Sequence, residues 1–148
     1  VISVLYIDVE NFKHINDAFG HPAGDKALSI VAGILQGRIR PTDNICRSYK
    51  HGDEFVVVLR ELDRVRAITI GLHLQQAVAS DKTFELSPLS ISFGVAELRQ
   101  EDMSNNPADD LSRIIGYADA DRIRSRKTAP QENTQLVLGL GVEEKQAA

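Results

Sequence analysis

Apolar and polar residues follow one another along the chain in patterns that predict both strands and helices. Two short, almost continuous apolar runs, 1–7 and 55–59, have the composition of strands buried on both faces of a sheet. Elsewhere apolar residues recur every three or four positions, which is the spacing of amphipathic helices. An alternating segment predicts a further strand over 89–96 that ends in a turn at Gly94.

Four helices are expected from the apolar spacing, over about 11–20, 25–39, 63–80 and 108–127. Asn11 is expected to cap the first of them and Gly20 to stop it. The apolar residues expected to face inward are Phe12, Ile15, Phe19, Leu28, Val31, Ala32, Leu35, Ile39, Val65, Ile68, Leu72, Val78, Leu111, Ile114, Ile115 and Ala118.

The predicted element order is β-α-α-β-β-α-β-α-β, with a last short strand at 135–138. One antiparallel hairpin, at 47–59, lies among strands that helices separate. This order favours an α+β sandwich, in which helices cover a central and mostly antiparallel sheet. A length of 148 residues, 43% of them hydrophobic, fits a single domain over 1–140. Residues 141–148 are expected to begin a C-terminal linker.

Charge and composition exclude several classes of partner. The net charge of −4 gives no basic field for nucleic acid or for a membrane surface. The lone Cys46 cannot form a disulfide within the chain and is expected in the core. No apolar run is long enough to span a bilayer. We therefore expect a cytoplasmic location, and the abrupt start in a strand suggests a segment of a longer, even membrane-anchored, protein.

The hairpin carries the first candidate chemistry. Two adjacent carboxylates, Asp53 and Glu54, precede its apolar strand, and Gly52 beside them lets another molecule approach the backbone. Such a pair suits a divalent cation. The alternative is a solvated turn, because Gly-Asp is common in turns, and this stretch alone does not decide between them.

A second candidate group lies near the start of the chain. Asp8 ends the first buried strand, which is where α/β proteins place ligands. Asp25 lies in the first turn of a predicted helix, and there the helix dipole alone is enough to explain a carboxylate. Neither residue identifies a site by itself.

Longer motifs decide the matter. The run from Asp8 to Asp25 reads DVENFKHINDAFGHPAGD and resembles the D-x-D-x-F-K-x-x-N-D-x-x-G-H-x-x-G-D run of the GGDEF domain family, the diguanylate cyclases. The likeness covers residues 1–127 and includes RPTD at 40–43, GDEF at 52–55 and SFG at 92–94. So many fixed positions at fixed spacing identify the chain as a member of that family.

The resemblance implies an activity and partners. Members of the family join two GTP molecules into cyclic di-GMP, each domain of a homodimer holding one GTP together with Mg²⁺ or Mn²⁺. The metal would neutralise phosphate charge and ease formation of the attacking alkoxide. GGDEF domains lie behind sensor domains and often before phosphodiesterase domains, so a fusion to one or both is expected.

The resemblance also implies a metal site. By that likeness Asp8 and Asp53 bind the metal, helped by the carbonyl of Val9. Glu54 would lie beside the reacting hydroxyl, where it assists deprotonation or holds metal. Hard oxygen ligands of this kind suit Mg²⁺.

Further residues are expected to bind the nucleotide. Asn16 and Asp25 would hydrogen-bond the guanine edge, where a carboxylate accepts from the N1 and N2 donors. Phe12 and Lys13 belong to the loop–helix junction whose backbone amides meet phosphates. Arg126 falls where the family carries a Lys that grips the phosphates.

Arg40 and Asp43 form the R-x-x-D of the family's inhibitory product site. An Arg can grip phosphate and stack on guanine, and an Asp accepts from the guanine edge. The alternative stays open: Arg40 satisfies the end of a helix while Asp43 lies in a turn.

The chain departs from the family in its hairpin. Two extra residues follow Arg47, and His51 stands in place of the first glycine. A side chain at that position takes up room and restricts φ.

The last helix departs from the family as well. Arg122 stands where the family carries Leu, which is expected to loosen this helix end. Pro130 stands where the family carries a phosphate-binding Arg, so one cation is lost.

Two functions remain after these departures. The first is the GGDEF domain of a cyclic di-GMP signalling protein that binds GTP and Mg²⁺ and acts as a nucleotidyltransferase, with catalysis impaired by the altered hairpin. The alternative is a catalytically inactive regulatory module that senses GTP or cyclic di-GMP and controls an adjacent domain. The retained metal carboxylates argue against a simple dimerisation scaffold.

Overall fold

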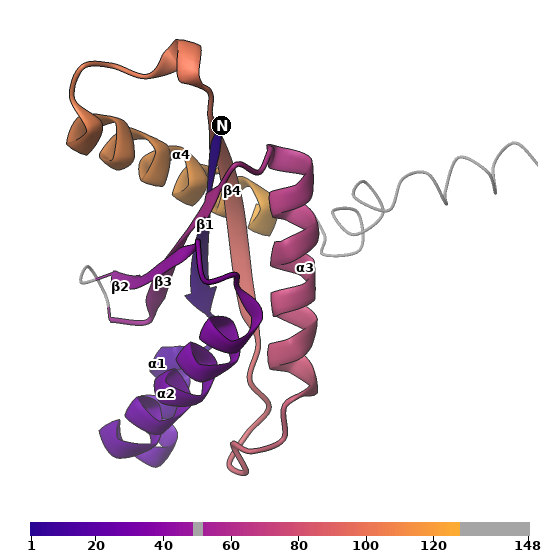
Figure 1. Cartoon of the computed structure of the whole chain (residues 1–148). Helices are drawn as coiled ribbons and strands as arrows, with labels where there is room; N and C mark the ends of the chain where they lie inside the picture. The colour runs from indigo at the N-terminus through magenta and orange to yellow at the C-terminus, as the bar shows by residue number, and fades with distance from the viewer. Residues whose placement is uncertain (49–51, 128–148) are drawn as a thin grey trace, which may run out of the picture.

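The computed structural model describes residues 1–48 and 52–127 (Figure 1). Four strands and four helices, with one short 3-10 turn, make up this described part. Their bounds are β1 (Ile2–Val9), α1 (Phe12–Phe19), α2 (His21–Arg38), β2 (Asn44–Ser48), β3 (Glu54–Arg60), α3 (Arg64–Ser80), β4 (Ile91–Leu98), η1 (Gln100–Asp102) and α4 (Pro107–Lys127). The expected strand at 135–138, the linker at 141–148 and the position of Pro130 lie outside the described residues.

The four strands form one antiparallel sheet in the order β2-β3-β1-β4, which confirms the predicted α+β class. The first strand of the chain is therefore central, between the hairpin strand β3 and the late strand β4. In this register Asp8 pairs with Glu54 on one side and with Ser92 on the other. The pairing alone places three polar side chains in one row across an end of the sheet.

Helices cover both faces of the sheet because successive strand residues point to opposite sides. Leu5, Ile7 and Val9 of β1 belong to a core shared with α1, α2 and α3. Val4 and Tyr6 belong to a smaller core shared with α4. Asp8 follows the even-numbered register, so it lies on the face that α4 covers.

Local signals fix the helix ends. The side chain of Asp63 accepts a hydrogen bond from the backbone N–H of Arg66 at 2.9 Å and caps α3. Gly20 adopts a φ of 88° between α1 and α2, so it stops the first helix as expected. Asn11 precedes α1, but its side chain makes no capping hydrogen bond, and its φ is 56°.

The inward faces of α1, α3 and α4 differ from the prediction. Val65 is 73% exposed and Leu111 is 44% exposed, and Phe19 is exposed as well. Small residues replace the expected apolar ones: a Cβ at Gly71 of α3 would lie 2.4 Å from the ring of Phe93. The close packing of that ring against the helix, rather than hydrophobicity alone, selects the buried face.

Strand β4 also differs, because it continues through Gly94 to Leu98 instead of turning there. Gly94 is the point where α4 crosses the strand: a Cβ there would lie 2.1 Å from the carbonyl oxygen of Ala118. The glycine allows a close approach of two backbones rather than a turn.

Cys46 was expected in the core and is exposed. It lies on β2, an edge strand that pairs only with β3 in the described sheet. Within the described ranges, the helices are too short or too polar to cross a membrane.

Candidate metal and nucleotide site

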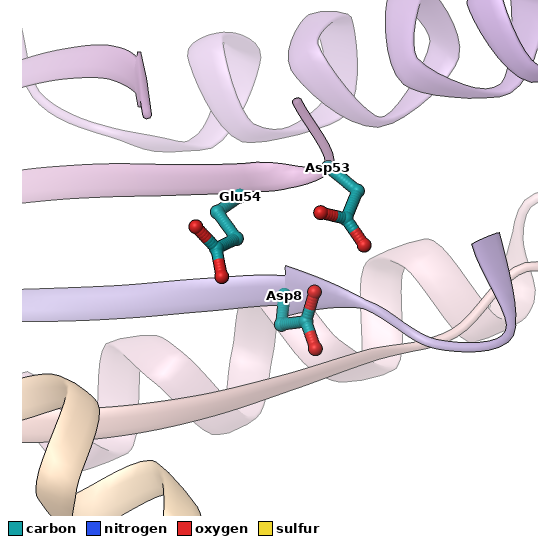
Figure 2. A group of neighbouring side chains, drawn as sticks. All are labelled: Asp8, Asp53 and Glu54. Carbon is teal, nitrogen blue, oxygen red and sulfur yellow. The ribbon is translucent and has the colours of Figure 1, made fainter. Parts of the chain in front are cut away.

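Three carboxylates converge at the end of the central strand. Asp8 comes from the end of β1, and Asp53 and Glu54 come from the start of β3, and one oxygen of each lies within 4.8 Å of the others. Figure 2 shows the three side chains grouped at the neighbouring ends of the two strands. The backbone N–H of Val9 donates to the carbonyl of Asp53 at 3.0 Å, which ties the two strand ends together. A set of hard oxygen ligands with this spacing fits Mg²⁺ or Mn²⁺.

Burial and a neighbouring carboxylate shift the pKa of Asp8. Burial raises the pKa of Asp8 to about 6, and the negative charge of Asp53 adds to this increase. Two nearby guanidinium groups, on Arg122 and Arg126, act in the opposite direction without reversing it. Crowded carboxylates of this kind gain stability when positive charge is placed among them.

Glu54 is buried and held by a tyrosine. The phenol of Tyr6 donates a hydrogen bond to Glu54 Oε2 at 2.6 Å. Burial, followed by this contact with Glu54, raises the pKa of Tyr6 above its ordinary value, so the phenol keeps its proton. The Glu54 carboxylate is therefore held in one orientation toward the cluster.

Two arginines of α4 reach Asp8. Arg122 Nη1 lies 3.2 Å from Asp8 Oδ2, and Arg126 Nη2 lies 3.6 Å from the same oxygen. Arg126 also pairs with Glu10 at 2.5 Å. The residue expected to grip phosphate thus lies at the edge of the acidic cluster, already bound to a carboxylate.

Arg122 corrects an expectation. It was expected to loosen the end of α4, but it is buried and pairs with Asp119 at 2.9 Å as well as with Asp8. Neither Arg122 nor Tyr6 was expected from the sequence to belong to the site. The available signal was spacing: position 122 lies four residues after Ala118, on the buried stripe of the helix.

The guanine-reading residues that the likeness implies lie where α1 packs on α2. Asn16 Oδ1 is buried without a hydrogen-bond partner among the described residues. A Cβ at Gly24 would lie 1.8 Å from that oxygen, so only glycine leaves room for the amide. Asp25 follows on α2 and is exposed. An amide oxygen without a partner on half-buried Asn16, together with the exposed carboxylate of Asp25, fits a base edge that carries hydrogen-bond donors.

A second orphan atom lies beside the carboxylate cluster. Ser92 Oγ is buried without a partner among the described residues, and Ser92 is the cross-strand neighbour of Asp8. Buried polar groups are normally hydrogen-bonded. The two orphan atoms found in the described chain, on Asn16 and Ser92, therefore both belong to the region expected to hold the nucleotide and its metal.

The other two residues expected to bind the nucleotide, Phe12 and Lys13, lie at the start of α1. Phe12 begins the helix and is half-buried against the larger core, whereas Lys13 is exposed. The backbone turns sharply just before them, at Asn11 in the left-handed region. The first N–H groups of α1 follow shortly after Asp8 at the end of β1, and N–H groups at the start of a helix suit phosphate oxygens.

Arg40 and Asp43 lie apart from the carboxylate cluster, in the connection between α2 and β2. Both oxygens of Asp43 are engaged: one accepts from the backbone and Nε of Arg40, and the other accepts from Arg40 Nη2 at 2.7 Å and from the backbone N–H of Arg60. Burial would raise the pKa of Asp43, but these hydrogen bonds outweigh it and hold the pKa below its usual range. Asp43 thereby fixes a partly exposed guanidinium in one orientation.

The bend of the hairpin is described only in part. Arg47 Nε donates to the carbonyl of Gly52 at 2.7 Å, and Gly52 has a φ of 81°. His51 and the two residues before it lie outside the described ranges.

Comparison with known proteins establishes the family. A sequence model described as "Diguanylate cyclase, GGDEF domain" matches residues 1–130, so the chain belongs to the GGDEF domain family. It is 34% identical over 122 residues to the diguanylate cyclase DosC of Escherichia coli K12, covering 80% of this chain and 25% of DosC. It is 42% identical over 87 residues to the diguanylate cyclase DgcP of Pseudomonas aeruginosa, covering 58% of this chain and 13% of DgcP. The chain therefore spans a quarter or less of these relatives.

Solved structures agree. The active GGEEF domain of a diguanylate cyclase from Vibrio cholerae superposes with a TM-score of 0.73 at 28% identity, covering 85% of this chain and 76% of that one. The GGDEF domain of DgcB from Caulobacter crescentus, solved in complex with c-di-GMP, gives a TM-score of 0.71 at 25% identity, covering 85% and 72%.

Proposed function

We propose that this chain is the GGDEF domain of a cyclic di-GMP signalling protein, and that it joins two GTP molecules into cyclic di-GMP and two diphosphates across a homodimer. The observation that carries the proposal is the convergence of Asp8, Asp53 and Glu54 within 4.8 Å at the end of β1. Their oxygens fit Mg²⁺ or Mn²⁺. As in the family, we expect fusion to sensor or phosphodiesterase domains and a cytoplasmic location.

Each carboxylate has a separate task. Asp8 and Asp53, with the Val9 carbonyl, hold the metal, which when bound offsets phosphate charge and lowers the cost of an alkoxide. Glu54 lies beside the attacking 3′-hydroxyl of the GTP and takes its proton. The hydrogen bond from Tyr6 at 2.6 Å orients this carboxylate for that transfer.

The nucleotide lies along the start of α1. Asn16 and Asp25 bind the guanine edge, and the glycine at position 24 leaves the space that the amide occupies. Phosphate oxygens meet the backbone N–H groups at Phe12 and the charge of Lys13. Arg126 grips the phosphates after exchanging its contact with Glu10, 2.5 Å away in the structure, for a phosphate oxygen.

Product inhibition uses Arg40. Its guanidinium binds a phosphate or stacks on a guanine of cyclic di-GMP. Because both oxygens of Asp43 accept from protein donors, we assign Asp43 the task of positioning Arg40 rather than reading the base.

A second candidate function is a regulatory module that binds GTP or cyclic di-GMP without turnover. It is favoured by the two arginines that lie near Asp8, at 3.2 and 3.6 Å, and by the sequence changes at His51 and Pro130. If the longer hairpin limits turnover, replacing residues 49–51 by a single Gly should raise the rate of product formation.

Incubation with GTP and Mg²⁺, followed by chromatography, tests the proposal. Cyclic di-GMP should appear with the natural chain and should be lost with Asp53→Ala. Glu101→Ala is the matched control, because it removes an exposed carboxylate in η1, away from the acidic cluster. Product formation that Asp53→Ala leaves unchanged would refute the assignment. Nucleotide binding without product would establish the regulatory module instead.

A further inference from the structure

Arg122 interrupts the apolar stripe that α4 presents to the sheet. Ile114, Ala118 and Arg122 recur every four residues and are all buried. An arginine keeps its proton in proteins, so it carries a permanent positive charge into the interface. Burial of such a charge requires partners of opposite sign.

Gly94 of β4 determines where this charge is delivered. A Cβ at Gly94 would lie 2.2 Å from the backbone nitrogen of Arg122, so helix and strand touch at this point. Gly94 pairs with Tyr6 in the sheet, and Asp8 follows two residues later on β1. The side chain of Arg122 therefore starts at the closest contact between α4 and β4, next to the end of the central strand.

The guanidinium has three protein partners there. It lies 5.8 Å from the centre of the Tyr6 ring, 3.2 Å from Asp8 and 2.9 Å from Asp119. Its side chain is only 9% exposed. Arg122 thus cannot move into solvent without leaving the buried interface between α4 and the sheet.

Asp8 is the shared partner. It is one of the three carboxylates whose oxygens lie within 4.8 Å of one another, and its Oδ2 accepts from Arg122. A divalent ion bound by the same cluster would meet a fixed positive charge a few ångströms away. Like charges at such a separation repel strongly, most of all where water is excluded.

We propose that Arg122 is a built-in counter-cation of the acidic cluster, which stabilises the cluster without metal and lowers its affinity for a free divalent ion. This inference rests on the metal site of the proposed function. The negative charge of a triphosphate offsets the guanidinium, so the ion is bound together with the nucleotide rather than ahead of it. Arg122 acts on the metal through Asp8, as a positioning and charge-balancing residue.

The test is a calorimetric titration of the 148-residue chain with Mn²⁺ alone. Arg122→Leu and Arg122→Gln should each bind Mn²⁺ at least tenfold more tightly than the natural chain, a difference of about 1.4 kcal/mol. Arg124→Leu is the matched control: it removes one charge from the same helix, but from an exposed side chain that lies 3.6 Å from Asp121. Its Mn²⁺ affinity should equal that of the natural chain.

Thermal unfolding supplies a second measurement that does not depend on activity. In EDTA the two Arg122 variants should unfold at a lower temperature, and Mn²⁺ should raise their midpoints by more than it raises that of the natural chain. Arg122→Gln keeps an amide that can hydrogen-bond to Asp119, so the comparison survives if the leucine variant fails to fold.

The outcomes separate this inference from the proposed function. If the natural chain and Arg122→Gln bind Mn²⁺ with equal affinity, the inference is overturned. If adding Asp53→Asn then abolishes Mn²⁺ binding in both, the metal site still stands. Weaker Mn²⁺ binding by the Arg122 variants would overturn the inference too, since Arg122 would then assist the metal. No Mn²⁺ binding by any variant, with or without GTP, would refute the metal site itself.

Discussion

The phenol of Tyr6 donates a 2.6 Å hydrogen bond to Glu54, from the central strand to its neighbour, on the face that α4 covers. Replacement by Phe keeps the ring beneath Arg122 but leaves a buried carboxylate oxygen without its donor. Tyr6→Phe should therefore lower the free energy of unfolding by about 1–3 kcal/mol and should also slow cyclic di-GMP formation.

Urea unfolding and product chromatography measure the two effects of Tyr6→Phe. Tyr117→Phe is the control, because it removes a hydroxyl from an exposed side chain on α4. Loss of stability without loss of turnover would mean that Tyr6 holds the fold but does not orient Glu54.

Gly94 tests the contact between α4 and the sheet. A Cβ at this position would lie 2.1 Å from the carbonyl oxygen of Ala118, and both groups are backbone, which cannot rotate away. Gly94→Ala should destabilise the chain by about 1–3 kcal/mol, the usual range for overpacking. Gly116, which lies on α4, has open space around it. Gly116→Ala should therefore stabilise the chain by up to about 1 kcal/mol, because Ala is the better helix former. Equal unfolding midpoints for the two variants would contradict the packing described here.

Arg40 tests the product site. Arg40→Ala should raise the Kd for cyclic di-GMP at least tenfold, about 1.4 kcal/mol, as measured by calorimetry. Arg38→Ala removes an exposed charge from the nearby end of α2 and should leave the Kd unchanged. An unchanged Kd in Arg40→Ala would show that Arg40 does not bind cyclic di-GMP.

Asp43 gives a prediction about pH. Burial pushes the pKa of Asp43 upward, but the hydrogen bonds from Arg40 and from the backbone of Arg60 outweigh it, so the pKa in the fold is lowered. A lowered pKa contributes stability above the pKa of the unfolded chain, about 3.9, and this contribution is lost as the pH falls through the folded-state value. Asp43→Asn should therefore unfold more easily at neutral pH and should lose less stability on acidification.

Unfolding curves at neutral and acidic pH test this prediction, with Asp17→Asn on the exposed surface of α1 as the control. The same loss on acidification in Asp43→Asn and in the natural chain would show that Asp43 is not responsible.

The sequence predicted much of the fold because strands and helices leave local signals. The apolar runs placed β1 and β3, and Asp63 marked the start of α3. The prediction that Val65 and Leu111 face inward was wrong, because the buried face of each helix depends on contacts with residues that are distant in the sequence. Gly71 packs against Phe93, and Gly94 against α4, and neither contact has a local signature in the sequence.

Only those residues of the candidate site that belong to family motifs could be predicted from the sequence. Asp8 and Glu54 are far apart in the chain, and strand pairing brings them together. In the sequence, Arg122 was only a departure from the family pattern. Its role could not be predicted because its partners, Asp8 and Asp119, are identified only by the structure. Asp43 similarly proved to be saturated by protein donors, which spacing alone does not show.

The most direct test of the central claim is calorimetric titration with GTP, in Mg²⁺ and in EDTA, of the natural chain and of the double variant Asp8→Asn/Asp53→Asn. We expect saturable binding that requires Mg²⁺ and that disappears in the double variant. Binding of GTP that is equally tight in EDTA, or equally tight without the two carboxylates, would contradict it.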